Sequence, residues 1–270
     1  MEYMCQLSGK SEAEIYEDLK GVIFLNPMYG YGNSTEAKYL MADEYLSGNV
    51  REKLAWAKRS AELSPEDYKV HVEALEKVQP KDLTASEISV RLGATWLPPE
   101  IVEKFIFEFL GTPRYAQWNI KLHFSQYTGE WNLEGKSYDR GNVKAYNTYG
   151  TSRINAYKII EETLNLKDVR IFDYIEEPDG KKKAVLNKKE TAIAQSKQEL
   201  IKQGFQDWIW ADPERRERLC KLYNEKFNSI RPREYDGSHI TFNGMNPEIE
   251  LREHQKNAVA HILYGGNTLL

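Results

Sequence analysis

The sequence predicts a mainly helical α+β protein with two β-hairpins. Apolar residues recur at helical spacing over most of the 270 residues. Two pairs of short, alternating segments interrupt this pattern, and a glycine-containing turn joins the members of each pair, at 120–124 with 131–133 and at 169–175 with 181–186. The composition, 41% hydrophobic and 29% charged, is ordinary for a globular protein.

Residues 1–36 are predicted to form a helix and a strand. Ser11 and Glu14 fit a capping box at the start of the helix, and the apolar segment 22–25 forms the strand. The sequence Asn-Pro-Met-Tyr that follows, at 26–29, is similar to the Asn-Pro-Pro-Tyr motif of amino-methyltransferases. The second proline is missing and too few residues precede the motif for a cofactor-binding unit, so an ordinary turn is the better interpretation.

Residues 37–114 are predicted to form an acidic helical domain, with one helix starting at Ser64-Pro65. His71 lies on the apolar face of that helix and is interpreted as a core residue, because no second ligand follows at metal-binding spacing. Residues 83–111 are similar to a helix-turn-helix. Their second helix, however, offers several glutamates that would repel phosphate. A packing helix after a tight turn at Gly93 is the better interpretation.

Residues 115–187 are predicted to form a basic, aromatic domain, in which Thr151-Ser152 caps a helix between the two hairpins. Segment 111–160 has seven Lys and Arg against three acids, interleaved with aromatics that include Tyr115 and Trp118. Cations neutralise phosphates and aromatic rings stack on bases, so this segment predicts DNA contact. The alternative, an aromatic core with solvated lysines, stays open. The DNA-binding candidates are Lys121, Trp131, Lys136, Arg140, Lys144 and Arg153, with Arg231 and Arg233 as a weaker second group.

Residues 188–250 are predicted to form a helical domain, and 251–270 a separate terminal segment. The helix at 188–210 is amphipathic, and a second helix starts at Asp212-Pro213. A connection at 237–250 contains one short strand. The expected apolar stripe of the first helix consists of Ile193, Leu200, Ile201, Phe205 and Trp208. In the last segment a helix at 253–264 is followed by the first residues of an apolar strand, 267–270.

The motifs of several enzyme classes are missing from the sequence. It has no phosphate-binding loop, no nucleophile elbow and no zinc-protease motif, so no catalytic residue and no metal site are predicted. Cys5 and Cys220 are the only cysteines, which excludes a disulfide framework and favours a cytoplasmic location. The acidic, polar N-terminus is no signal peptide, and no apolar run is long enough for a membrane span.

The segment Leu-Arg-Glu-His-Gln at 251–255 resembles the Q motif of Swi2/Snf2-like helicases, which precedes a helix, a strand and the phosphate-binding loop. Segments 45–54, 91–100, 148–165 and 223–237 resemble large helicase–methyltransferase proteins of phages and integrative conjugative elements, including DarB-like antirestriction proteins. The resemblance implies that 251–270 is the truncated start of a RecA-like lobe. It also implies that Gln255 and Arg252 contact the nucleotide.

The expected function follows from this resemblance. The chain would be an accessory region that binds and positions double-stranded DNA for a mobile-element helicase or translocase fused to a DNA methyltransferase. It would have no catalysis or cofactor of its own, while ATP and Mg would act in the parent protein. The alternative is a protein-interaction or inhibitor module of the antirestriction or anti-CRISPR type, directed against a host defence protein such as a nuclease.

Overall fold

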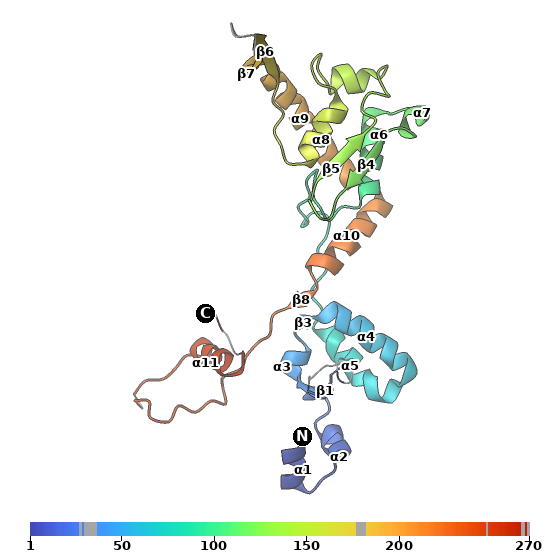
Figure 1. Cartoon of the computed structure of the whole chain (residues 1–270). Coiled ribbons are helices and arrows are strands. Elements are labelled where there is room, and N and C mark those ends of the chain that lie inside the picture. The colour runs from blue at the N-terminus through green and yellow to red at the C-terminus, as the bar shows by residue number, and fades with distance from the viewer. Residues whose placement is uncertain (27–28, 30–36, 177–181, 247, 266–267, 269–270) are drawn as a thin grey trace. The chain divides into compact units, whose positions relative to one another are not determined.

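The structure is a computed structural model that describes residues 1–26, 29, 37–176, 182–246, 248–265 and 268. It is a mainly helical α+β protein, as predicted, and its described strands form four two-stranded antiparallel sheets (Figure 1). The chain divides into two compact units, residues 1–82 with 224–270 and residues 83–223. The finer division into five segments stays a prediction.

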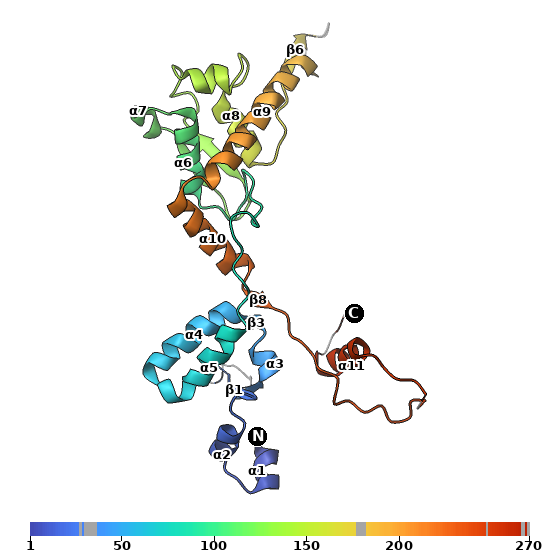
Figure 2. The same ribbon diagram turned by 180° about the vertical axis from the view of Figure 1, so that it is seen from behind.

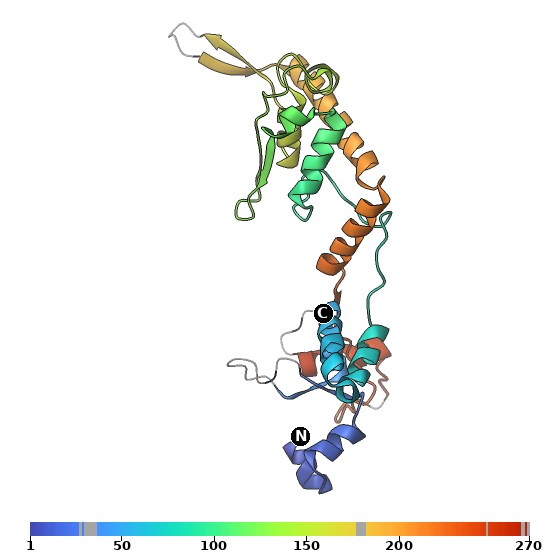
Figure 3. The same cartoon turned by 90° about the vertical axis from the view of Figure 1, so that its right-hand side faces the viewer.

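The second unit contains both predicted hairpins. They pair β4 (Lys121–Phe124) with β5 (Trp131–Glu134), and β6 (Phe172–Glu176) with β7 (Lys182–Leu186). Figure 3 shows the β6–β7 hairpin projecting from the helices of its unit. Every residue of its two strands is exposed except Asp173, which is half-buried. The turn predicted between β6 and β7 lies outside the described residues.

Three helices contribute most of the helical residues in the core of the second unit: α6 (Pro99–Leu110), α8 (Ala156–Leu164) and α9 (Lys188–Ile209). Helix α9 contacts both of the others, as Figure 2 shows. The fully buried ring of Phe105 on α6 lies 5.1 Å from the ring of Phe205 on α9 and 5.4 Å from that of Trp208. The smaller elements are α7 (Arg114–Gln117), the π-helix η1 (Lys144–Thr148) and α10 (Pro213–Phe227), which continues into the first unit.

The first unit has its own core around Phe24, Tyr45 and Leu75. His71 is fully buried there, as predicted, and forms hydrogen bonds with the hydroxyls of Tyr45 and Tyr16 at 2.9 and 3.2 Å. Burial lowers the pKa of His71 to about 4. The helices and strands of the first unit are α1 (Glu2–Ser8), α2 (Glu12–Asp18), β1 (Ile23–Leu25), β2 (Tyr39–Met41), α3 (Ala42–Tyr45), β3 (Gly48–Asn49), α4 (Val50–Leu63), α5 (Pro65–Lys77), β8 (Ile230–Arg231) and α11 (Glu253–Gly265).

Some predicted helix boundaries and faces are wrong. Helix α8 is capped by Asn155, whose side chain accepts from Lys158 N–H, and not by Thr151-Ser152. Two members of the apolar stripe expected on α9 are exposed: Ile193 by 40% and Leu200 by 52%. The buried face of α9 instead includes the polar Thr191 and Gln198, because their side chains bond the backbone N–H groups of residues 171 and 169.

Other differences concern short elements. Residues 84–88 form a turn and not a helix, which supports the rejection of a helix-turn-helix there. The expected loop at 137–150 contains η1. A short strand was predicted within 237–250, but the described residues of that connection contain none. The short strand β8 lies before the connection and pairs with β3. Residues 267, 269 and 270 of the predicted terminal strand and residues 27 and 28 of the predicted 26–29 turn lie outside the described residues.

Candidate nucleic-acid interface

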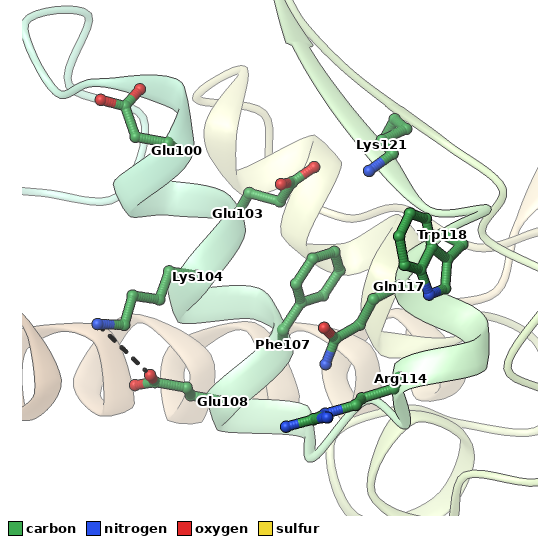
Figure 4. Close-up of a pocket in the computed structure, with 9 residues that line it drawn as sticks. All are labelled: Glu100, Glu103, Lys104, Phe107, Glu108, Arg114, Gln117, Trp118 and Lys121. Atoms are coloured by element: carbon green, nitrogen blue, oxygen red, sulfur yellow. Dashed lines mark ion pairs between the residues drawn. The ribbon is translucent and has the colours of Figure 1, made fainter.

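A groove opens between α6 and α7 in the second unit. Helix α6 ends at Gly111, whose φ of 63° is a left-handed conformation that glycine adopts without steric cost. Pro113 then starts the short helix α7, and the chain continues into β4. The groove has a volume of about 670 Å³ (Figure 4). Its lining residues are Glu100, Glu103, Lys104, Phe107, Glu108, Arg114, Gln117, Trp118 and Lys121.

The α7 side of the groove carries uncompensated positive charge. Arg114 and Lys121 are exposed, and neither forms an ion pair in the part of the chain that the structure describes. Trp118 lies between them in Figure 4 and is 80% exposed. This side of the groove therefore combines two cations with an accessible aromatic ring.

The α6 side of the groove is acidic, but two of its three carboxylates are paired within the unit. Glu100 accepts from Arg218 at 2.9 Å. Glu108 accepts from the indole N–H of Trp208 at 2.7 Å and lies 3.8 Å from Lys104. Glu103 has no ion-pair partner among the described residues, and its Oε1 accepts from the backbone N–H of residue 122 at 3.3 Å.

Two further predicted cations lie near the end of α6. Lys144 lies close to Gly111: a Cβ atom added to this glycine would be 4.0 Å from Nζ of Lys144. Arg140 is exposed in the neighbouring loop, which Asn142 ties to α6 by donating to the Leu110 carbonyl at 3.0 Å. Neither Lys144 nor Arg140 has a carboxylate partner within the described ranges. We call the group Arg114, Trp118, Lys121, Arg140 and Lys144 the α6–α7 surface.

The other predicted cations of this unit are neutralised by their own carboxylates. Lys136 Nζ lies 2.6 Å from Glu161, which is only 7% exposed. Arg153 lies 2.8 Å from Asp173 and donates to the carbonyl of residue 172 at 3.0 Å. A cation that already has a carboxylate partner releases fewer counterions on binding a phosphate, so both residues are weaker candidates than the α6–α7 surface.

The Glu161 carboxylate also makes the stability of the unit depend on pH. Burial alone raises its pKa, but hydrogen bonds from two lysines and one backbone N–H outweigh burial and lower the pKa. A lowered pKa in the folded state contributes stability above the unfolded pKa of about 4.3, and this contribution is lost as pH falls through the folded pKa. We therefore expect the melting temperatures of the wild type and Glu161→Gln to converge as pH is lowered from 7 to about 3. A constant difference across that range would contradict this assignment.

Trp131 is a wrong prediction as a base-stacking residue. Only 2% of it is exposed, and its ring lies 4.5 Å from that of Phe124 in the hairpin. The alternation of β5 turns Trp131 and Leu133 toward the core. Its indole N–H is buried without a hydrogen-bond partner in the described structure. For Trp131 the alternative interpretation holds, in which the aromatic residues of the basic segment form a core.

Arg231 and Arg233 belong to the first unit and are held by local contacts. Arg231 lies 3.2 Å from Glu234 and donates to the carbonyl of residue 46. Arg233 lies 2.7 Å from Asp43, and its guanidinium carbon is 5.0 Å from the centre of the Tyr235 ring. Arg231, Asp43 and Glu234 line a groove of about 410 Å³ with two more acids. This acidic lining opposes phosphate binding.

Gln255 and Arg252 lie at the start of α11, also in the first unit. Both side chains are exposed, and Gln255 Oε1 accepts from the backbone N–H of Arg252 at 2.9 Å. Gln255, the third residue of α11, therefore accepts from the backbone at the helix N-terminus, as the Glu or Gln of a capping box does. Its role toward a nucleotide stays a prediction.

Within the described ranges, no group of three or more His, Cys, Asp or Glu is arranged to hold a metal ion. No helix in the described part of the chain is both long and apolar enough to cross a membrane.

Sequence alone does not single out Arg114 and Trp118. Both belong to the basic, aromatic segment, but that segment also contains the buried Trp131 and the paired Lys136. The missing information is the burial and pairing of each side chain. One available signal was Pro113, which starts a new helix immediately before Arg114.

Two family models match the chain, whereas no curated protein and no solved structure matches it. Residues 1–36 match a model described as "Probable helicase, winged helix domain". This match covers α1, α2 and β1 and fits a helicase-associated region. Residues 91–229 match the model of a second family, and this range includes the α6–α7 surface and more than half of the chain. The chain therefore belongs to the family described as domain of unknown function DUF8437.

Proposed function

We propose that this chain is a helicase-associated region that binds DNA through the α6–α7 surface. The observation that carries the proposal is the exposure of Arg114, Lys121, Arg140 and Lys144, none of which has a carboxylate partner among the described residues. The exposed Trp118 lines the same groove as Arg114 and Lys121. Unpaired cations can neutralise phosphates and release counterions, which supplies most of non-specific DNA affinity. The match to a helicase winged-helix model supports the helicase association.

The DNA-binding role is assigned to the second unit and not to the winged-helix match. Helix α2 is acidic, with Glu12, Glu14, Glu17 and Asp18 among its seven residues. A helix that reads the major groove usually offers polar or basic side chains, and carboxylates there repel phosphate. Within residues 1–36, α2 is therefore a poor reading helix.

A second, more specific part of the proposal concerns the larger protein to which this chain would belong. The resemblance of 251–255 to the Q motif supports an accessory role beside an SNF2-like motor, with ATP and Mg bound in the motor and no catalysis by this chain. The resemblance of other segments supports a helicase–methyltransferase of a mobile element, related to DarB-like antirestriction proteins and active in the cytoplasm.

DNA binding by this chain is tested by measuring the affinity of the whole chain for a labelled duplex at several salt concentrations. Fluorescence anisotropy reports the binding. We expect affinity to fall steeply as salt increases, by about one unit of log K per unit of log salt for each phosphate contacted. Absence of binding at low salt, or affinity independent of salt, would contradict a DNA-binding function.

A protein-interaction module is the second candidate. One observation favours it: α1 buries none of its residues and exposes Tyr3 by 71% and Leu7 by 71%. Exposed apolar side chains next to the acidic α2 suit a basic protein partner such as a nuclease of a host defence system. Tight binding of such a nuclease, unaffected by charge changes on the α6–α7 surface, would support this candidate.

A further inference from the structure

The groove between α6 and α7 leaves an aromatic ring without a packing partner. Trp118 is 80% exposed, and no ring contact involves it in the described residues. The half-buried ring of Phe107 on α6 lines the same groove. Aromatic side chains in a groove of this kind are platforms on which flat ligands stack.

The charges around Trp118 restrict the ligand. Arg114 and Lys121 lie on either side of it in Figure 4, and both are exposed and without carboxylate partners in the described chain. A ligand with a flat ring between two negative groups matches this arrangement. A nucleobase with its two flanking phosphates has this chemistry, provided that the base is unpaired and can leave the stack.

The opposite side of the groove adds a hydrogen-bond acceptor. Glu103 Oε1 accepts from the backbone N–H of residue 122, and no bond to Oε2 occurs in the part of the chain that the structure describes. A carboxylate accepts well from an exocyclic amino group, such as cytosine N4. Thymine lacks such a group.

We propose that this groove binds an unpaired base of single-stranded DNA. The base stacks on Trp118, the flanking phosphates contact Arg114 and Lys121, and Glu103 accepts from an exocyclic amino group. The inference rests on the proposed function, since it assigns a single-strand specificity to the same surface. A region of this kind would hold the strand that a helicase separates.

The test is Trp118→Ala in the full chain, with Tyr127→Ala as the matched control because Tyr127 is also fully exposed in the same unit. Labelled oligo(dC), oligo(dT) and a duplex of equal length are the probes. Loss of one stacking partner should weaken binding of both single strands roughly tenfold. Duplex affinity should stay within about twofold, because its paired bases do not reach the ring. The control should bind all probes like the wild type.

Glu103→Gln tests the amino-group contact. It keeps an amide oxygen for the backbone N–H of residue 122 but places an amide donor against the base. The wild type should prefer oligo(dC) over oligo(dT), and the variant should lose that preference. Equal wild-type affinity for the two strands would contradict the role of Glu103.

Two outcomes separate this inference from the proposed function. If Trp118→Ala leaves single-strand affinity unchanged while Lys121→Glu weakens duplex binding, the base site is wrong and the DNA-binding surface stands. If the folded wild-type chain binds neither single strands nor duplex, both are wrong and a protein occupant of the groove is favoured. Unchanged unfolding curves show that each exposed-site variant is folded.

Discussion

The triple variant Lys121→Glu, Arg140→Glu and Lys144→Glu is expected to weaken duplex binding by at least ~100-fold at low salt. Each lysine or arginine that contacts a phosphate contributes a charge-assisted hydrogen bond of about 1.5 kcal/mol or more, and tenfold in affinity corresponds to about 1.4 kcal/mol. Reversal of the charge adds repulsion to that loss. The measurement is duplex affinity by fluorescence anisotropy.

The matched control is Lys188→Glu, Lys189→Glu and Lys221→Glu. These three lysines are also exposed in the second unit but lie at the start of α9 and on α10, outside the α6–α7 surface. The change in net charge is the same, so any difference between the two triple variants reports location. Equal losses in both variants would show that overall charge, and not the α6–α7 surface, determines binding.

Phe105→Ala is expected to destabilise the second unit by about 3–5 kcal/mol, the usual cost of removing a buried phenylalanine ring. The ring is fully buried and contacts the rings of Phe109, Phe205 and Trp208, so it joins α6 to α9. Its loss leaves a cavity below the helix that carries one side of the groove. Denaturant unfolding measures the change in the free energy of unfolding.

Tyr115→Ala is the control for this substitution. Tyr115 is 67% exposed on α7, and an exposed substitution usually changes stability by less than about 0.5 kcal/mol. A cost below about 1 kcal/mol for Phe105→Ala would contradict the central position of this ring in the core.

The helices and hairpins of the second unit were predictable because their signals are local. The Pro98-Pro99 start of α6 and the turn at Gly129 lie next to the elements that they define. The pairing of β3 with β8 was not predictable, since it joins residues 48–49 to 230–231 and each strand has only two residues. The polar face of α9 was missed because Thr191 and Gln198 are buried by hydrogen bonds to a distant segment.

The candidate site was predictable as a segment but not as a set of residues. Composition predicts a basic, aromatic stretch, but the side chains of that stretch differ in burial and in pairing. Trp131 is a core residue, while Trp118 is exposed. Lys136 has a carboxylate partner, while Lys121 has none in the described structure. Pairing and exposure depend on tertiary contacts, which one sequence does not show.

The most direct test of the central claim is the salt dependence of duplex binding for the wild type and for Lys121→Gln, Arg140→Gln and Lys144→Gln combined. Neutralisation removes the phosphate contacts without adding repulsion. If these cations contact phosphates, the slope of log K against log salt becomes shallower by about three units, roughly one for each contact. Identical slopes for the two proteins would contradict DNA binding through the α6–α7 surface.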